Sequence, residues 1–176
     1  MSSRVGSFIF LVTFGVLDTI TSQFMWHLFG WLMLPQLVLI FIIASLGENI
    51  VSSQGYYHYT RQERNGPFIR NVPIWIVFLW IFFIQGSLLF SFAIGLTGVQ
   101  AATVSGLIAC IIDFLFLEPL LSRHFELWRW NPTRKGYFYF IPARLNRFTA
   151  PPGNYVTWIL FPMVANTFLM ILMLTI

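Results

Sequence analysis

The feature that most constrains this chain is a series of five apolar stretches, each long enough to cross a lipid bilayer. A helix rises about 1.5 Å per residue, so about twenty apolar residues span a hydrocarbon layer roughly 30 Å thick. With 57% hydrophobic and 9% charged residues, most side chains are expected to contact lipid rather than water. The sequence therefore predicts an all-α, polytopic transmembrane bundle that forms a single membrane domain over residues 1–176. Its expected spans are about 6–23, 27–47, 72–97, 101–121 and 155–176.

All ten Lys and Arg residues fall on one side of this arrangement. They precede the first span or lie in two long loops, about 48–71 and 122–154. The connections on the opposite side, near 24–27 and 97–101, contain none. Because short cytoplasmic loops retain Lys and Arg, this partition predicts that the N-terminus and both long loops are cytoplasmic and that the C-terminus is outside.

The net charge of +4 does not indicate a nucleic-acid partner, because the cations are interleaved with aromatic residues beside predicted spans. Anionic lipid headgroups are the expected partner of such juxtamembrane loops. Trp128, Trp130 and Tyr137 lie among these cations, and one interpretation makes them an interfacial belt with cationic anchors.

Three of the six acidic residues, Asp18, Glu48 and Asp113, fall inside or at the ends of apolar spans. Ionisable groups are costly there and often mark a functional site. Asp113 lies more than two turns into the fourth span, where an apolar environment favours its protonated form. A protonated carboxyl can act as a general acid. The alternative is a structural carboxyl that hydrogen-bonds another helix, and the residues alone leave both open.

Glu118 follows Asp113 by five residues, about 140° around an α-helix, so the two are not expected to face the same way. Glu48 closes the second span on the side of Glu118, and interfacial salt bridges are the expected role of both glutamates. The sequence contains no His and Cys cluster with metal-ligand spacing, no glycine-rich phosphate loop and no Ser-centred elbow. It therefore predicts no metal site.

A series of short motifs begins in the fourth span and ends in the fifth. In order they are Asp113, Glu118-Pro119, Trp128-Arg129-Trp130, Gly136-Tyr137-Phe138 and Pro151 with Asn154 and Trp158. This series resembles the signature of the membrane carotenoid-biosynthesis family, which includes carotenoid hydratases of bacteria and haloarchaea. A weaker match upstream joins Tyr57 and Tyr59 with Asn71-Val72-Pro73, and the matches together cover about residues 55–160.

The resemblance implies hydration of a terminal isopropylidene double bond on a long polyene or isoprenoid lipid in a prokaryotic cell membrane. No cofactor is needed for this reaction. On this hypothesis Asp113 is the acid and Glu118 is the base on the water side, although the two roles are exchangeable. Asn154 holds water or a partner carboxyl. The residues expected to line the entrance are Trp128, Trp130, Tyr137 and Trp158.

Two other classes of protein stay open. A non-catalytic subunit would pack this bundle against a membrane-protein partner, and a homo-oligomer is equally compatible with the sequence. A small transporter or prenyl-transfer protein is the second class. A prenyltransferase, however, would need paired acidic motifs for a magnesium diphosphate, and only Asp113 and Glu118 approach one.

Overall fold

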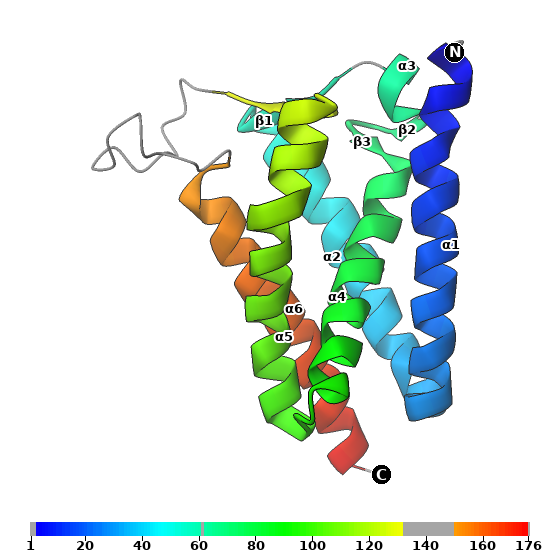
Figure 1. Ribbon diagram of the computed structural model, residues 1–176, viewed down its shortest axis with the longest axis vertical. Coiled ribbons are helices and arrows are strands. Elements are labelled where there is room, and N and C mark those ends of the chain that lie inside the picture. The colour runs from blue at the N-terminus through cyan, green and yellow to red at the C-terminus, as the bar shows by residue number, and fades with distance from the viewer. Residues whose placement is uncertain (1–2, 61, 132–149, 176) are drawn as a thin grey trace.

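The expected all-α bundle is confirmed. The computed structural model describes residues 3–60, 62–131 and 150–175, and it is a bundle of long helices with small strands at one end (Figure 1). The long helices are α1 (Ser3–Phe29), α2 (Met33–Ser53), α4 (Ile74–Ala93), α5 (Gly98–Ile112) and α6 (Pro152–Leu174). The short elements are η1 (Gly30–Leu32), β1 (Tyr57–Tyr59), α3 (Gln62–Asn65), β2 (Phe68–Ile69), β3 (Val72–Pro73), η2 (Asp113–His124) and β4 (Trp128–Trp130).

Within the described residues, four helical runs are long and apolar enough to cross a membrane, as in an integral membrane protein. The first run, Phe8–Ser53, contains most of α1 and all of α2, and these two helices pass along the bundle in opposite directions (Figure 1). The reversal falls at η1, where Gly30 has a φ of 55° that side chains with a Cβ rarely adopt. The number of membrane crossings and the side each end faces stay predictions.

The helix boundaries differ from the expected ones in two places. Helix α2 continues to Ser53, past the expected end at residue 47, so Glu48 lies within it. After α5, the chain continues as a π-helix, η2, from Asp113 to His124. Pro119 lies inside η2 and has no backbone N–H to donate, which is a physical reason for the departure from α-helical bonding.

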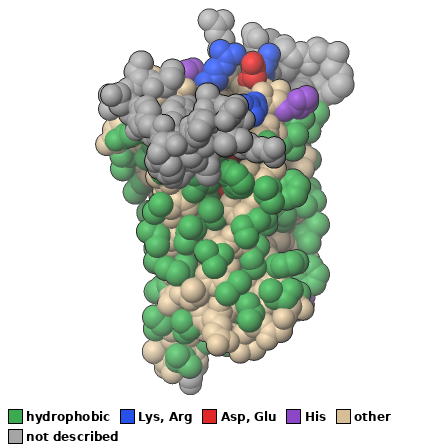
Figure 2. Space-filling view, turned by 60° about the vertical axis from the view of Figure 1, so that its left-hand side comes forward, with side chains coloured by type: hydrophobic (Ala, Val, Ile, Leu, Met, Phe, Trp, Pro, Cys, Tyr) green, Lys and Arg blue, Asp and Glu red, His purple; other side chains and the backbone are tan. Residues whose placement is uncertain are grey.

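Charged side chains gather at the end of the bundle that carries the strands, above a surface of hydrophobic side chains (Figure 2). Here β1 pairs with β4 and β2 pairs with β3, both antiparallel. Glu126 forms ion pairs with Arg64 at 3.3 Å and with Arg129 at 2.9 Å. The first of these contacts joins α3 to the segment after η2.

A buried amide joins four helices in the apolar half of the bundle. Asn166 of α6 donates to Ser105 of α5 at 2.7 Å and to the carbonyl of Ile84 in α4 at 3.2 Å, and it accepts from Gln36 of α2 at 2.6 Å. All three polar side chains are fully buried. Such bonds join helices where apolar side chains gain little by meeting each other rather than lipid.

Replacement of Asn166 by Leu should lower the free energy of unfolding in detergent by about 1–2 kcal/mol, because the change leaves Gln36 and Ser105 buried without this partner. Thr103→Val is the matched control, since Thr103 is exposed and bonds only the carbonyl of Val99 in its own helix among the described residues. Thermal unfolding followed by size-exclusion chromatography measures both. Equal stability of the two variants would contradict a structural role for the Asn166 network.

Candidate functional site

The β1–β4 pair places four aromatic side chains on one face. Tyr57 lies opposite Trp130, and Tyr59 lies opposite Trp128. Because side chains alternate along a strand, these four share a face, while His58 and Arg129 between them are exposed on the other. The ring centroids of Tyr57 and Trp130 are 4.9 Å apart. The pair therefore turns an aromatic surface toward the helices.

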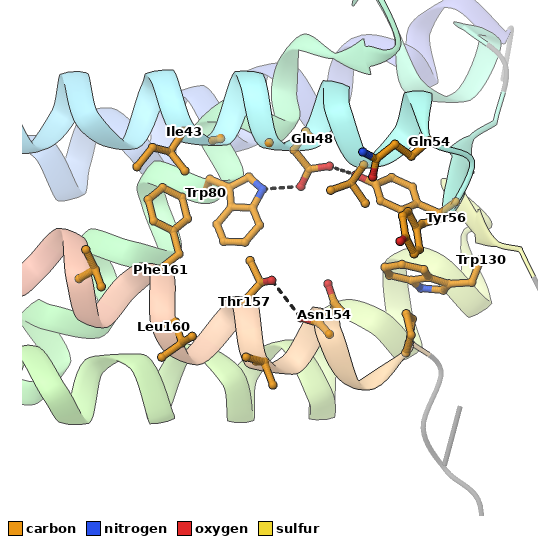
Figure 3. Close-up of a pocket in the computed structure, with 18 residues that line it drawn as sticks. Ile43, Glu48, Gln54, Tyr56, Trp80, Trp130, Asn154, Thr157, Leu160 and Phe161 are labelled. Carbon is orange, nitrogen blue, oxygen red and sulfur yellow. Dashed lines mark hydrogen bonds between the residues drawn. The ribbon is translucent and has the colours of Figure 1, made fainter. Parts of the chain in front are cut away.

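Glu48 lies near the end of α2 and accepts hydrogen bonds from three aromatic side chains. The hydroxyls of Tyr57 and Tyr59 both donate to Oε2, the second at 2.7 Å, and the Trp80 indole donates to Oε1 at 2.7 Å. Figure 3 shows the side chain of Glu48 projecting from α2 toward Trp80, with the bond from the indole. Glu48 was expected to form an interfacial salt bridge, but its partners among the described residues are these neutral donors. Three donors suit an ionised carboxylate, which can only accept.

Glu118 and Asp113, both of η2, are each 1% exposed. The indole of Trp128 donates to Oε1 of Glu118 at 3.2 Å, and that of Trp130 donates to Oε2 at 3.0 Å. The side-chain amide of Asn154, in the first turn of α6, donates to Oδ2 of Asp113 at 2.7 Å. Among the described residues no hydrogen bond is made to the other oxygen of Asp113, Oδ1.

The expectation that Asp113 and Glu118 face different ways is wrong, and the π-helix is the reason. The 140° separation applies to α-helical geometry, whereas i→i+5 bonding brings residues five apart back to nearly the same side. Both carboxyls consequently line one small cavity of about 40 Å³. Glu48 lines it as well, so three carboxyls from two helical runs meet there.

The walls of this inner cavity are mostly aromatic. Trp80 and Trp158 stack with ring centroids 4.0 Å apart and an interplanar angle of 10°. Leu117, Leu79 and Ile76 fill the remaining apolar wall. A volume of about 40 Å³ with several polar partners has room for one or two water molecules.

A much larger groove of about 700 Å³ lies beside the inner cavity, between α2 and α6 (Figure 3). The two spaces share five lining residues: Glu48, Tyr57, Trp80, Trp130 and Asn154. Away from these residues, apolar side chains such as Ile43, Leu160 and Val164 line the groove. Glu48 therefore lies in the polar part of a largely apolar groove, while Asp113 and Glu118 line only the adjoining inner cavity.

Most of the expected site residues meet at this place. Trp130 and Asn154 line both spaces, while Trp128 and Trp158 line the inner cavity only, so these two do not form an entrance from the groove. Tyr137 lies outside the described residues. Of the two secondary candidates, Glu48 joins the cluster. Asp18 does not: it lies in α1 and accepts from Ser22, whose hydroxyl lies 2.9 Å from the Gln85 side chain of α4.

Neither a role for Trp80 in the site nor the aromatic environment of Glu48 was predicted from the sequence. The alternating Tyr57-His58-Tyr59 and Trp128-Arg129-Trp130 patterns carried the signal for two strands with one aromatic face. Nothing in the local sequence marks Trp80, which lies within a continuous apolar helix. In the described part of the chain, no group of three or more His, Cys, Asp or Glu residues is placed to hold one metal ion.

Compared with protein-family models, with curated proteins and with solved structures, the chain matches none. Fold and site define a helical membrane protein with a buried cluster of acidic and aromatic side chains. The resemblance to the carotenoid-biosynthesis family therefore stays a prediction from the sequence motifs.

Burial raises the pKa of both Tyr57 and Tyr59 above the ordinary value near 10, and the negative charge of Glu48 raises it further. The folded protein keeps these two protons at a pH where the unfolded chain releases them. The stabilisation is therefore complete below about pH 10 and is lost as the pH rises above it, by about 1.4 kcal/mol per pH unit for each tyrosine. Measured from about pH 8 to 11, the melting temperature of the wild type should change little from these two groups up to about pH 10 and then fall, and the fall above pH 10 should be smaller in the Tyr57→Phe, Tyr59→Phe double variant. Parallel declines would contradict this protonation state.

Proposed function

We propose that this protein adds water to a carbon–carbon double bond of a membrane isoprenoid or polyene, by acid catalysis and without a cofactor. The observation that carries the proposal is the meeting of Glu48, Asp113 and Glu118 in one aromatic-walled cavity at the end of an apolar groove. Protonation of an alkene creates a carbocation, so the reaction needs an acid, a shielded cationic intermediate and a base for the attacking water.

Asp113 is the acid in this proposal. Its Oδ1 accepts no hydrogen bond from the described residues, so this oxygen can carry the proton that Asp113 gives to the alkene carbon. The electron pair of the double bond forms the new C–H bond, and the neighbouring carbon becomes a tertiary cation. The faces of Trp80 and Trp158 and the carboxylate of Glu48 stabilise this positive charge.

Water held in the inner cavity then attacks the cation and forms the C–O bond. Glu118 takes the proton that this water loses, because two indole donors keep its oxygens in the acceptor role and both carboxyls line the cavity. Return of that proton from Glu118 to Asp113 through cavity water restores the starting state. The net change is the addition of one water molecule.

The charge of the groove favours this reaction over prenyl transfer. The described residues lining the groove and the inner cavity include no Lys or Arg, and they do include three carboxyls. A diphosphate would meet like charge there with no cationic partner among these residues, whereas a neutral alkene that becomes a cation meets complementary charge. As a further part of the proposal, the charged end of the bundle faces the cytoplasm of a prokaryotic cell.

Expression in a lycopene-accumulating bacterial host tests the function. Lycopene is a linear polyene with an isopropylidene group at each end, so the active protein should yield products heavier by one water per reacted end. Chromatography and mass analysis of the extracted pigments detect them. Unchanged pigment in a host where the protein is present in the membrane would count against hydration of this substrate. Co-purification of a stable membrane partner would then support the subunit alternative.

A further inference from the structure

The groove between α2 and α6 is polar at one end and apolar along the rest of its length. Along α6 its lining runs from Pro151 to Val164, a distance of about 20 Å at the rise of a helix. This is about two thirds of the hydrocarbon thickness of a bilayer. Leu160 and Val164 are also exposed on the outer surface of the bundle, so the groove opens to the lipid-facing side.

The chemistry of the lining selects among possible occupants. Glu48 and Asn154 stand at the polar end, and none of the described lining residues is a Lys or Arg. A phospholipid would place its phosphate near Glu48 with no cationic partner among these described residues, which is unfavourable. A neutral hydrocarbon chain fills the apolar part and brings no charge to the polar end. The inner cavity, which shares Glu48 and Asn154 with the groove, has room for one or two water molecules beside that end.

We propose that the α2–α6 groove holds the hydrocarbon chain of a linear isoprenoid or polyene, which enters sideways from the bilayer and places its terminal double bond beside Glu48 and Asn154. Alkene and water then approach the carboxyl cluster from opposite sides, the alkene from the groove and the water from the inner cavity. The placement of the reacting end rests on the proposed function, but occupancy of the groove by the chain does not.

Leu160 and Leu107 offer a matched pair of positions for a binding test. Each is 48% exposed, and only Leu160 lines the groove. They lie at similar depth, because a Cβ on the neighbouring Gly106 would contact the carbonyl oxygen of Ile159. Benzoylphenylalanine placed at either position forms covalent bonds with adjacent C–H groups under light. In membranes containing lycopene, we expect several times more protein–lycopene adduct at position 160 than at 107.

A second experiment tests whether the groove is needed for the hydration of long chains but not of short ones. Leu160→Trp narrows the groove, so hydration of lycopene should fall about tenfold or more, while geranylacetone, a short chain with the same end group, should be hydrated nearly as before. Leu107→Trp should change neither rate. A purely structural defect would instead lower both rates together.

The outcomes separate the groove from the reaction. Selective adducts at position 160 without any hydration would support the groove and contradict the proposed reaction. Hydration with equal adducts at 160 and 107, and no effect of Leu160→Trp, would support the reaction and overturn the groove. Adducts at position 160 made only to phospholipid, or only to a second copy of the protein, would also overturn the groove proposal.

Discussion

Replacement of Asp113 by Asn should lower the rate of hydration by about 10²–10⁴-fold, the usual contribution of a positioned general acid. The amide has nearly the same shape and can still bond Asn154, but it has no acidic proton to give to an alkene. The loss should therefore appear in turnover and not in the amount of folded protein. Product formed per folded protein in membranes or nanodiscs measures it.

Asp18→Asn is the matched control for this experiment. It makes the same chemical change in another helix, at a carboxyl that accepts from Ser22 and lines neither the groove nor the inner cavity. The turnover of this variant should stay within about twofold of wild type, because asparagine keeps the shape of Asp18 and can still accept the hydrogen bond from Ser22. If Asp113→Asn retained the activity of Asp18→Asn, Asp113 would not be the acid.

Among the variants considered for stability, Gly106→Val should lower the free energy of unfolding the most. A Cβ at this position would lie 2.2 Å from the carbonyl oxygen of Ile159 and 3.2 Å from Cβ of Met163, so α5 and α6 would have to move apart. Overpacking of this kind costs about 1–3 kcal/mol, and more where backbone must shift. Small residues allow helices to approach closely in membranes, and Gly98, Ala102 and Gly106 recur at four-residue spacing along α5.

Gly15→Val provides the comparison, since a Cβ at Gly15 of α1 meets nothing within 4 Å. Both changes insert the same β-branched side chain into a helix, so the difference between them isolates the contact with α6. Melting temperatures in the same detergent should be clearly lower for Gly106→Val. Equal melting temperatures would show that α5 and α6 do not depend on this close approach.

The sequence predicted the helical bundle well because each long apolar stretch can satisfy its backbone in lipid only as a helix. The boundaries were less predictable. Glu48 was placed at the end of a span, yet α2 continues past it to Ser53. The π-helix from Asp113 could not be anticipated, since its residues fit an α-helix equally well and only Pro119 marks a departure.

The candidate site was predictable in its residues but not in its geometry. Asp113 was predicted as a site residue because a carboxyl within an apolar span carries a free-energy cost. This cost is evident from the residue's position in the sequence, whichever side chains surround it in the fold. Asp18 is costly for the same reason, but the fold places it away from the carboxyl cluster. Partners such as Trp80 depend on which helices pack together, and this information comes from tertiary contacts rather than local pattern. The four aromatic residues of β1 and β4 needed the strand pairing before their common face was evident.

The most direct test of acid-catalysed water addition is hydration of lycopene by the purified protein in nanodiscs prepared in deuterium oxide. Acid-catalysed addition should leave one deuterium on the carbon adjacent to each new tertiary alcohol, and this C–D bond should persist after transfer to ordinary water. Oxygen in the product should come from solvent, as heavy-oxygen water would show. Unchanged lycopene, or an alcohol whose oxygen derives from dioxygen and whose adjacent carbon carries no deuterium, would contradict acid-catalysed water addition.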